Sequence, residues 1–246
     1  MPNYLRPQTV GDLLRNTFAV YGKGFRVIFL SYFLPVLPFG ICANEAQAAK
    51  NMGLAWLIVL CSIPVSLAAT AAITIAVSDI CLGNAPSLVR SYKKVFAVLL
   101  KLLGTNILQF IIIFIGFILL VVPGIIAMMW LFFTPSVVIL EGMGGFSALK
   151  RSKQLAHGYN WRNLGVFLLL LIVLIVIGFI VGAVVGAILA LLLPPATHAL
   201  LLRVVQAVLN PIGATITLTM IVLLYYDLRV RKEAYDAAAL AEDLRR

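Results

Sequence analysis

Six long apolar segments constrain the fold of this chain more than any other feature. They cover residues 27–43, 54–78, 103–122, 125–140, 164–193 and 211–226. A helix needs about 20 apolar residues to cross the hydrocarbon of a bilayer, and each segment is close to that length or longer. With 63% hydrophobic and only 11% charged residues, the chain has too few charges to cover a water-soluble fold. We therefore expect one integral membrane domain over residues 1–246, an all-α polytopic bundle of about six transmembrane helices.

Proline and glycine divide these apolar segments from one another. Pro123-Gly124 is a turn signal, and it splits an apolar run that is too long for a single crossing. Pro194-Pro195 ends the fifth segment, and a separate apolar piece over residues 199–209 precedes the sixth. Pro35 and Pro38 interrupt the first segment.

The basic residues are distributed very unevenly between the two sides of the predicted bundle. If the N-terminus is cytoplasmic, 17 of the 19 Lys and Arg residues fall on the cytoplasmic side, and only Lys50 and Arg203 do not. Such a bias fixes the orientation of membrane proteins. We expect both termini in the cytoplasm, the protein in the cell inner (cytoplasmic) membrane, and the turns near Lys50, residues 121–124 and His198 on the outer side. The net charge of +10 then indicates contact with anionic lipid rather than with nucleic acid.

A short amphipathic stretch precedes each odd-numbered segment, at residues 10–21, 87–99 and 147–157. Thr9 and Asp12 are spaced as a capping box at the start of the first stretch. Helices with one apolar and one basic face lie in the headgroup plane. We therefore predict three interfacial helices, each followed by a hairpin, as a threefold internal repeat with a short charged cytoplasmic tail. The predicted repeats cover approximately residues 9–82, 84–143 and 145–232, and the tail covers 233–246.

One acidic residue closes each even-numbered segment: Asp79, Glu141 and Asp227. The first two precede an arginine by eleven and ten residues, Arg90 and Arg151 respectively, and Asp227 is followed by Arg229 and Arg231. Functional acids in membrane proteins usually lie near mid-bilayer, whereas these lie at the edge. We expect ion pairs there in preference to transport chemistry.

The basic stretches also provide candidate contacts for lipid or a partner. Arg90, Lys94 and Lys101 fall on one side of a helix of 3.6 residues per turn. Two interpretations stay open: the cations serve only for anchoring and orientation, or they bind anionic headgroups or an acidic partner. The candidate contact residues are Arg90, Lys94, Lys101, Lys150 and Arg151.

Small and hydroxyl residues recur at every fourth position within two of the segments. Gly178, Gly182 and Gly186 would allow close helix packing, either within the chain or in a homo-oligomer. A hydroxyl stripe on the second segment could join helices or line a polar path, and we favour joining because no charged residue lies deep in the six segments. The stripe consists of Ser62, Ser66, Thr70, Thr74 and Ser78.

Motifs of catalysis and cofactor binding are absent from the sequence. It contains no phosphate loop and no Gly-x-Ser-x-Gly elbow. Cys42, Cys61 and Cys81 form no CxxC pair, and His157 and His198 are predicted on opposite sides of the membrane. We therefore predict no enzyme activity, no catalytic residue, no cofactor and no metal site.

Several stretches resemble a prokaryotic family of membrane domains related to the glycerophosphoryl diester phosphodiesterase membrane domain. They are residues 9–15, 122–125, 141–162 and 226–233. In the fused enzymes of that family a separate soluble barrel carries the hydrolysis, and a (β/α)8 barrel of about 250 residues has no place here. The resemblance implies a stand-alone membrane protein and transfers no site residue.

Two functional hypotheses follow from the sequence. The first is a non-enzymatic scaffold or accessory subunit that contacts anionic lipid of the cytoplasmic leaflet, a membrane protein partner or a second copy of the chain. The alternative is a passive carrier or channel for a small or lipid-like solute. The hydroxyl stripe and the prolines within the segments, which can kink helices, support the alternative.

Overall fold

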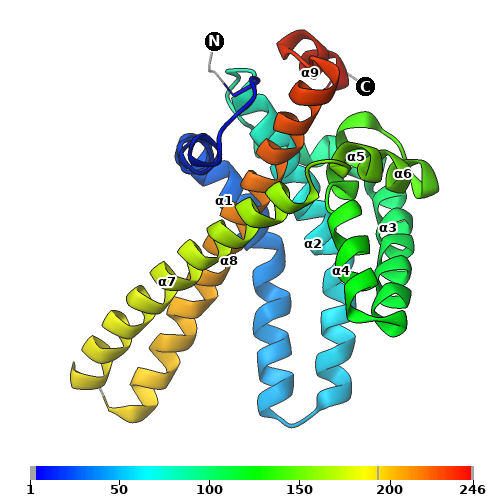
Figure 1. The fold of residues 1–246 in the computed structure, drawn as a ribbon. Coiled ribbons are helices and arrows are strands. Elements are labelled where there is room, and N and C mark those ends of the chain that lie inside the picture. Colours follow the sequence, from blue (N-terminus) through cyan, green and yellow to red (C-terminus); the bar gives the residue numbers. More distant parts are fainter. Residues whose placement is uncertain (1–3, 193, 245–246) are drawn as a thin grey trace.

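The computed structural model describes residues 4–192 and 194–244, and all regular elements in these ranges are helices. Their order along the chain is shown in Figure 1. The helices are α1 (Val10–Ala48), α2 (Met52–Cys81), α3 (Leu88–Leu119), α4 (Val121–Trp130), α5 (Thr134–Glu141), α6 (Gly145–Ala156), α7 (Asn160–Leu192), α8 (Pro195–Glu233) and α9 (Ala237–Asp243).

Six helical segments of the described chain are long and apolar enough to cross a membrane. They form three antiparallel hairpins: α1 with α2, α3 with the pair α4–α5, and α7 with α8 (Figure 1). The predicted all-α membrane bundle is thus confirmed. The hairpins follow one another as the predicted repeats do, but the threefold repeat itself stays a prediction.

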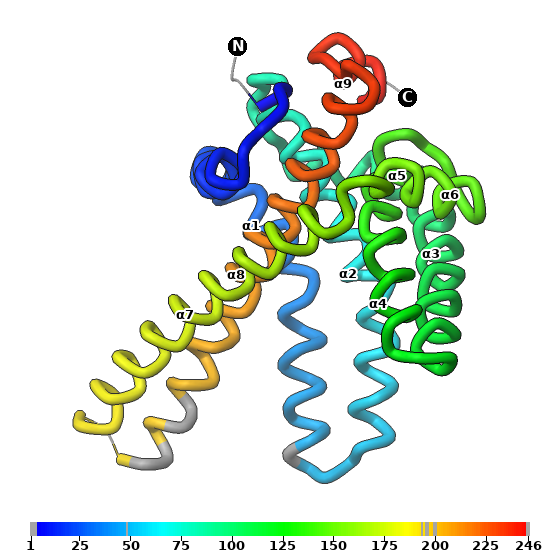
Figure 2. The backbone as a smooth tube through the Cα atoms, viewed as in Figure 1, coloured from blue at the N-terminus to red at the C-terminus, as the bar shows by residue number. Residues whose placement is uncertain are grey.

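The hairpins pack together at one end and diverge at the other (Figures 1 and 2). The packed end carries both termini, α6 and α9, and we call it the charged end. Burial follows the same division, because α2 is continuously buried from Ala71 to Cys81 whereas α7 buries only Asn163, Val166 and Leu170 near its start. The core therefore lies at the charged end, around the α8 side chains Tyr225 and Tyr226.

Only one of the three predicted interfacial helices is a separate element. This is α6, whereas residues 10–21 and 87–99 are the first turns of the long helices α1 and α3. Amphipathic periodicity predicts which face is buried but does not end a helix, and no proline or cap separates these stretches from the segments that follow. The predicted capping box is confirmed: the Thr9 side chain accepts from the Asp12 N–H, and Asp12 accepts from the Thr9 N–H.

Two further boundaries differ from those expected. The fourth segment is divided into α4 and α5 by a turn over residues 131–133. Pro211 lies inside the continuous helix α8, although a break was expected before it. Pro211 lacks the N–H that would reach the Ala207 carbonyl, yet membrane helices tolerate such a proline. The Thr215 hydroxyl donates to the Pro211 carbonyl at 2.7 Å.

The predicted charged tail is folded back onto the bundle. Ala234 adopts a left-handed conformation with φ of 50°, which reverses the chain after α8. Residues 237–243 then form α9, and Tyr235, Leu240 and Leu244 are buried. These apolar side chains explain the docking, since a tail with charged residues alone would have no surface to bury.

Candidate functional site

Each acidic residue that closes an even-numbered segment forms an ion pair with arginine, as expected. Glu141 pairs with Arg151 at 2.7 Å, and Asp227 pairs with Arg231 at 2.9 Å. The Asp79 pair with Arg90 is longer, at 3.6 Å. The pairs lie at the charged end. The Asp79 and Glu141 pairs each connect the end of one hairpin with the helix that follows it, whereas Asp227 and Arg231 lie on the same helix.

Asp227 is the centre of a contact that joins three parts of the chain. Its carboxylate also pairs with Arg162 of α7 at 2.7 Å and accepts the backbone N–H of Gln8 at 2.7 Å. Arg162 and Arg231 both donate to the Gln8 carbonyl, at 2.8 Å and 2.6 Å. This group, the Asp227 cluster, was not expected beyond Arg231, because nothing local in the sequence relates Gln8 or Arg162 to an acid so far away.

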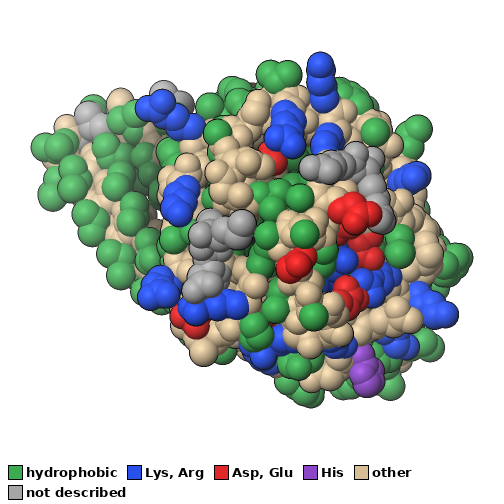
Figure 3. All heavy atoms as spheres, turned by 90° about the horizontal axis from the view of Figure 1, so that it is seen from above, with side chains coloured by type: hydrophobic (Ala, Val, Ile, Leu, Met, Phe, Trp, Pro, Cys, Tyr) green, Lys and Arg blue, Asp and Glu red, His purple; other side chains and the backbone are tan. Residues whose placement is uncertain are grey.

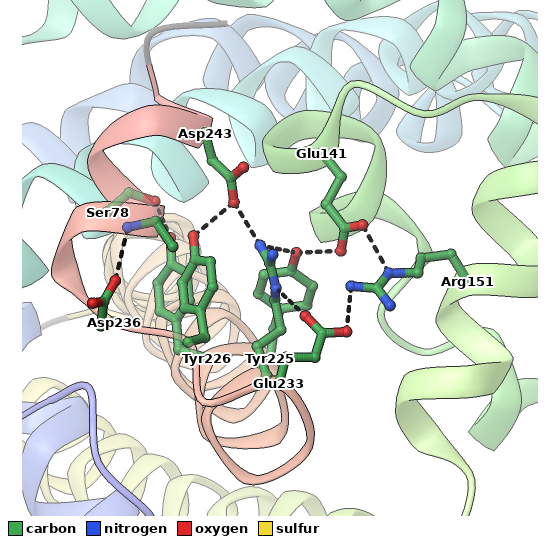
Figure 4. Close-up of polar contacts among 11 residues, drawn as sticks. Ser78, Glu141, Arg151, Tyr225, Tyr226, Glu233, Asp236 and Asp243 are labelled. Atoms are coloured by element: carbon green, nitrogen blue, oxygen red, sulfur yellow. Dashed lines mark hydrogen bonds and ion pairs between the residues drawn. The ribbon is translucent and has the colours of Figure 1, made fainter.

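A second ionic group, the Glu141 network, links α5, α6, α8 and α9 (Figure 4). Arg151 contacts both Glu141 and Glu233, and Arg229 contacts both Glu233 and Asp243. The Tyr225 hydroxyl donates to Glu141 at 2.7 Å. The network therefore joins the second and third hairpins and holds α9 through its last residue.

Within this network, burial by itself lowers the pKa of the Arg151 guanidinium. Its hydrogen bonds to Glu141 and Glu233, with the charges of these carboxylates, outweigh that effect and raise the pKa above the ordinary arginine value. Arg151 thus stays charged, and its charge pairs with Glu141 and Glu233 of the same chain.

Asp79 differs from the other two acids in its surroundings. Its side chain is completely buried, and neither carboxylate oxygen has a hydrogen-bond partner within the described chain. Buried carboxylates usually accept several hydrogen bonds. Arg90, itself half exposed, is the cation that compensates this charge.

The charged end has its cations mainly around the outside and its acids nearer the middle (Figure 3). Some of the exposed cations have no acidic partner: among the described residues, Lys93, Lys101 and Lys150 take part in no ion pair. We call these three the exposed lysines. They are free to meet anions outside the protein.

The five candidate contact residues fall into two groups. Lys101 and Lys150 are exposed, and Lys101 approaches only the Gly142 carbonyl, at 3.5 Å. Arg90 and Arg151 are engaged with buried or partly buried acids, and Lys94 is half buried beside Arg90. The basic residues therefore divide into those that pair with acids inside the protein and those that are open to its surroundings.

Large apolar side chains lie exposed beside the exposed lysines. On α3, Phe96 is 75% exposed and Leu100 is 83% exposed. Phe146 at the start of α6 and Trp161 at the start of α7 are similarly exposed. Aromatic and basic side chains together are typical of the membrane–water interface.

The predicted glycine ladder does not bring α7 into backbone contact with another helix of this chain. A Cβ atom on Gly178 or Gly182 would meet no atom within 4 Å, and one on Gly186 would meet only Leu202, at 3.7 Å. The glycines instead line a groove of about 710 Å³ between α7 and α8. The α8 side of the groove includes Gln206, Asn210 and Thr217.

The hydroxyl stripe of α2 forms its hydrogen bonds mostly within its own helix. Ser62, Ser66, Thr70 and Thr74 donate to carbonyls of their own helix three or four residues earlier. Ser78 alone in the stripe bonds across helices, to the Tyr226 hydroxyl at 2.5 Å. Joining of helices thus depends on the last residue of the stripe.

The remaining side chains with reactive chemistry are the possible metal ligands and the cysteines. Among the described residues, no three His, Cys, Asp or Glu side chains group as metal ligands would. The cysteines are free thiols: Cys42 and Cys61 are exposed on the long helices and Cys81 is buried.

Comparison with known proteins adds a family to this description. The model of a family described as a domain of unknown function (DUF7847) matches residues 51–228, which is most of the chain. The chain belongs to the DUF7847 family. Neither a curated protein nor a solved structure matches it.

The part that matches the DUF7847 family contains all three acids that close hairpins. It extends from the turn before α2 to the last turns of α8, and thus includes Asp79, Glu141 and Asp227 with Arg90, Arg151 and Arg162. Gln8 and α9 lie outside it. The DUF7847 region therefore supplies the ionic centres, and flanking residues complete them.

Proposed function

We propose that this chain is a non-enzymatic membrane scaffold or accessory subunit whose charged end binds anionic lipid headgroups of the cytoplasmic leaflet. One observation carries the proposal: Arg90, Arg151, Arg162, Arg229 and Arg231 pair with acids of the protein, whereas Lys93, Lys101 and Lys150 are exposed beside apolar side chains and take part in no ion pair within the described chain. Each cation near an anionic leaflet contributes about 1 kcal/mol, and the attraction fades within a Debye length of about 10 Å at 0.1 M salt.

The orientation is part of the same proposal. The distribution of 17 of 19 basic residues supports a charged end that faces the cytoplasm of the cell, in its inner membrane. We also propose a relation to the membrane domains of glycerophosphoryl diester phosphodiesterases, because residues 141–162, a stretch that carries the resemblance, include Arg151, Arg162 and Lys150.

Lipid binding is tested with the three exposed lysines changed together to Gln. We expect the Lys93→Gln, Lys101→Gln, Lys150→Gln variant in nanodiscs to retain fewer anionic phospholipids than the wild type. The loss should be about fivefold in affinity per lysine at low salt and should shrink as salt is added.

The matched control changes the two cations at the other end, Lys50→Gln with Arg203→Gln. This variant should retain the lipids of the wild type. Equal lipid binding by the wild type and the triple variant across a salt series would refute the proposal. Arg90 and Arg151 are left unchanged because losing either would leave its acidic partner without a cation. Any change in lipid binding could then come from altered folding.

A second candidate is a passive carrier of a lipid-like solute. The groove of about 710 Å³ between α7 and α8 favours it, as does a neighbouring groove of about 330 Å³ on the α1 side of α8. Asn210 lines both grooves and gives each a polar group in an apolar wall.

Filling the larger groove tests this candidate. Gly182→Leu should slow transfer of a fluorescent lipid analogue across proteoliposomes, whereas Gly165→Leu should not, because Gly165 lies on the same helix outside the groove. Equal rates for both variants would exclude the carrier.

A further inference from the structure

The turn between α3 and α4 differs in chemistry from the α1–α2 turn at the diverging end. From Phe110 to Phe133 the chain has no polar or charged side chain, and the turn lies in the middle of this run. The α1–α2 turn, by contrast, contains Glu45, Lys50 and Asn51. A turn that emerges into water normally contains polar residues, as the α1–α2 turn does.

The apolar side chains of the α3–α4 turn have no partner within the described protein. Leu119, Leu120, Val121 and Val122 are between 63% and 69% exposed. In water such a patch would be a strong site for aggregation or binding. Surrounded by acyl chains, it would be an ordinary lipid-facing surface.

The depth of this turn can be measured from α6, which the structure joins to the upper end of α4. The Ser152 hydroxyl of α6 donates to the Trp130 carbonyl at 2.9 Å and accepts the Phe133 N–H at 3.2 Å. Lys153 lies over the Trp130 ring, 3.9 Å from its centroid. A basic helix beside a tryptophan belongs at the membrane–water interface, so Trp130 marks that level.

From that level α4 descends by only ten residues to Val121, or about 15 Å at 1.5 Å per residue. The α3 side gives the same depth, because Gln109 donates to the Leu131 carbonyl at 3.1 Å and α3 ends ten residues later, at Leu119. The hydrocarbon of a bilayer is about 30 Å thick. The turn is therefore about half-way across.

Comparison with the other hairpins agrees with this depth. In Figure 1 the α3–α4 turn ends well short of the α1–α2 and α7–α8 turns. The two helices connect through one extended residue, Leu120, whose N–H donates to Gly116 and whose carbonyl accepts from Gly124. Pro123 has no N–H, so only Val121 and Val122 are left with unpaired amide donors at the start of α4.

We infer that the α3–α4 hairpin is re-entrant: it enters the bilayer from the charged end, turns among the lipid acyl chains and returns to the same side. The occupant of its exposed apolar surface is lipid hydrocarbon. The expectation that residues 121–124 reach the outer surface is thereby replaced.

Single cysteines in a background with Cys42, Cys61 and Cys81 changed to Ala test the inference. The probe is a membrane-impermeant maleimide, added to either side of sealed vesicles that contain the full chain. Ser147→Cys on α6 should react from one side and Lys50→Cys from the other. Val122→Cys should react from neither side, at a rate lower by more than an order of magnitude, and should react after detergent is added.

Two results would overturn the inference. Reaction of Val122→Cys from the Lys50 side would mean that the hairpin spans the membrane, and reaction from the Ser147 side would mean that it lies outside. A fluorophore at position 122 tests whether lipid or protein protects this residue. If lipid does, phospholipids brominated near the middle of the acyl chains should quench the fluorescence more than those brominated near the headgroup. Protection without such quenching would indicate a second copy or another protein, and would refute the lipid contact.

Discussion

At the scale of single residues, the charged end contains one acid, Asp79, that has a single ion-pair partner, Arg90, while Lys94 adds a second positive charge nearby. Asp79 is completely buried, accepts no hydrogen bond within the described chain, and lies 3.6 Å from Arg90. Glu141 and Asp227 have several partners each. Loss of one partner should therefore matter more at Asp79 than at the other two acids.

We expect Arg90→Gln to destabilise the protein by about 1–3 kcal/mol, because it leaves a buried carboxylate without its cation. Asp79→Asn removes that charge, so the double variant should lose less stability than the sum of the single variants. Thermal unfolding in detergent measures this coupling. Additive losses would show that the two side chains do not interact.

Tyr235 gives the protein a pH dependence at the alkaline end. Burial, together with the hydrogen bond that its hydroxyl donates to Asp243 at 2.7 Å, raises the pKa of Tyr235 well above the ordinary value of 10.0. The folded state therefore keeps this proton more tightly than the unfolded state does. The stabilisation is complete below pH 10 and is lost as the pH rises toward the folded-state pKa.

The measurement is the unfolding temperature of the wild type and of Tyr235→Phe between pH 8 and about pH 11. The wild type should be the more stable of the two at pH 8, and the difference should shrink above pH 10. A constant difference over the whole range would contradict the role of the Tyr235 proton.

At the scale of elements, two sets of glycines have opposite surroundings. A Cβ atom on Gly116 of α3 would meet the Gly124 Cα at 3.0 Å and the Pro123 carbonyl at 3.3 Å, both backbone atoms of α4. Gly182 of α7 has nothing within 4 Å. The helices of the second hairpin thus approach to backbone contact, whereas those of the third do not.

Gly116→Ala should therefore force α3 away from α4 and destabilise the protein by about 1–3 kcal/mol. Gly182→Ala, the matched control, should be neutral or stabilise α7 by up to about 1 kcal/mol, since alanine favours helix. Thermal unfolding of both variants in one detergent tests the pair. A loss at Gly182 as large as that at Gly116 would mean that the ladder has a partner helix from a second chain.

Sequence patterns predicted most of the elements but not where the long helices begin. Apolar length and the Pro-Gly turn were sufficient for six membrane segments. Continuity was not predictable, since the amphipathic start of α1 and the proline in α8 both look like boundaries, and only packing at the charged end determines that they are not. Docking of α9 depends on Tyr235, Leu240 and Leu244, three apolar residues among many polar ones.

At the scale of the whole molecule, the distribution of charge predicts one orientation. The charged end contains nearly all the basic residues, and the diverging end contains Lys50 and Arg203. A reporter that works only in the cytoplasm should be active when fused after the C-terminus and inactive when inserted at Lys50 or His198. Activity at both of these positions, which are predicted on the outer side, would reverse the orientation.

The ionic centres were predictable only where their partners are near in sequence. Asp79 precedes Arg90 by eleven residues and Glu141 precedes Arg151 by ten, across one short connection in each case. Proximity in the sequence is therefore enough to predict these pairs. Asp227 meets Arg231 one turn later, but its contacts with Arg162 and Gln8 span 65 and 219 residues. Such contacts depend on how three hairpins pack, which no local pattern encodes.

The contact between Gln8 and Asp227 also orders the biogenesis of the protein. The ribosome makes Gln8 before any of the hairpins, whereas Asp227 emerges only after α7 and most of α8. During translation the N-terminal segment therefore waits beside the membrane while the hairpins insert one after another. Closure of the Asp227 cluster is a late event, and a chain that stalls in its last hairpin presents an open Gln8 backbone and an unpaired Arg162 to the quality-control proteases of the cell.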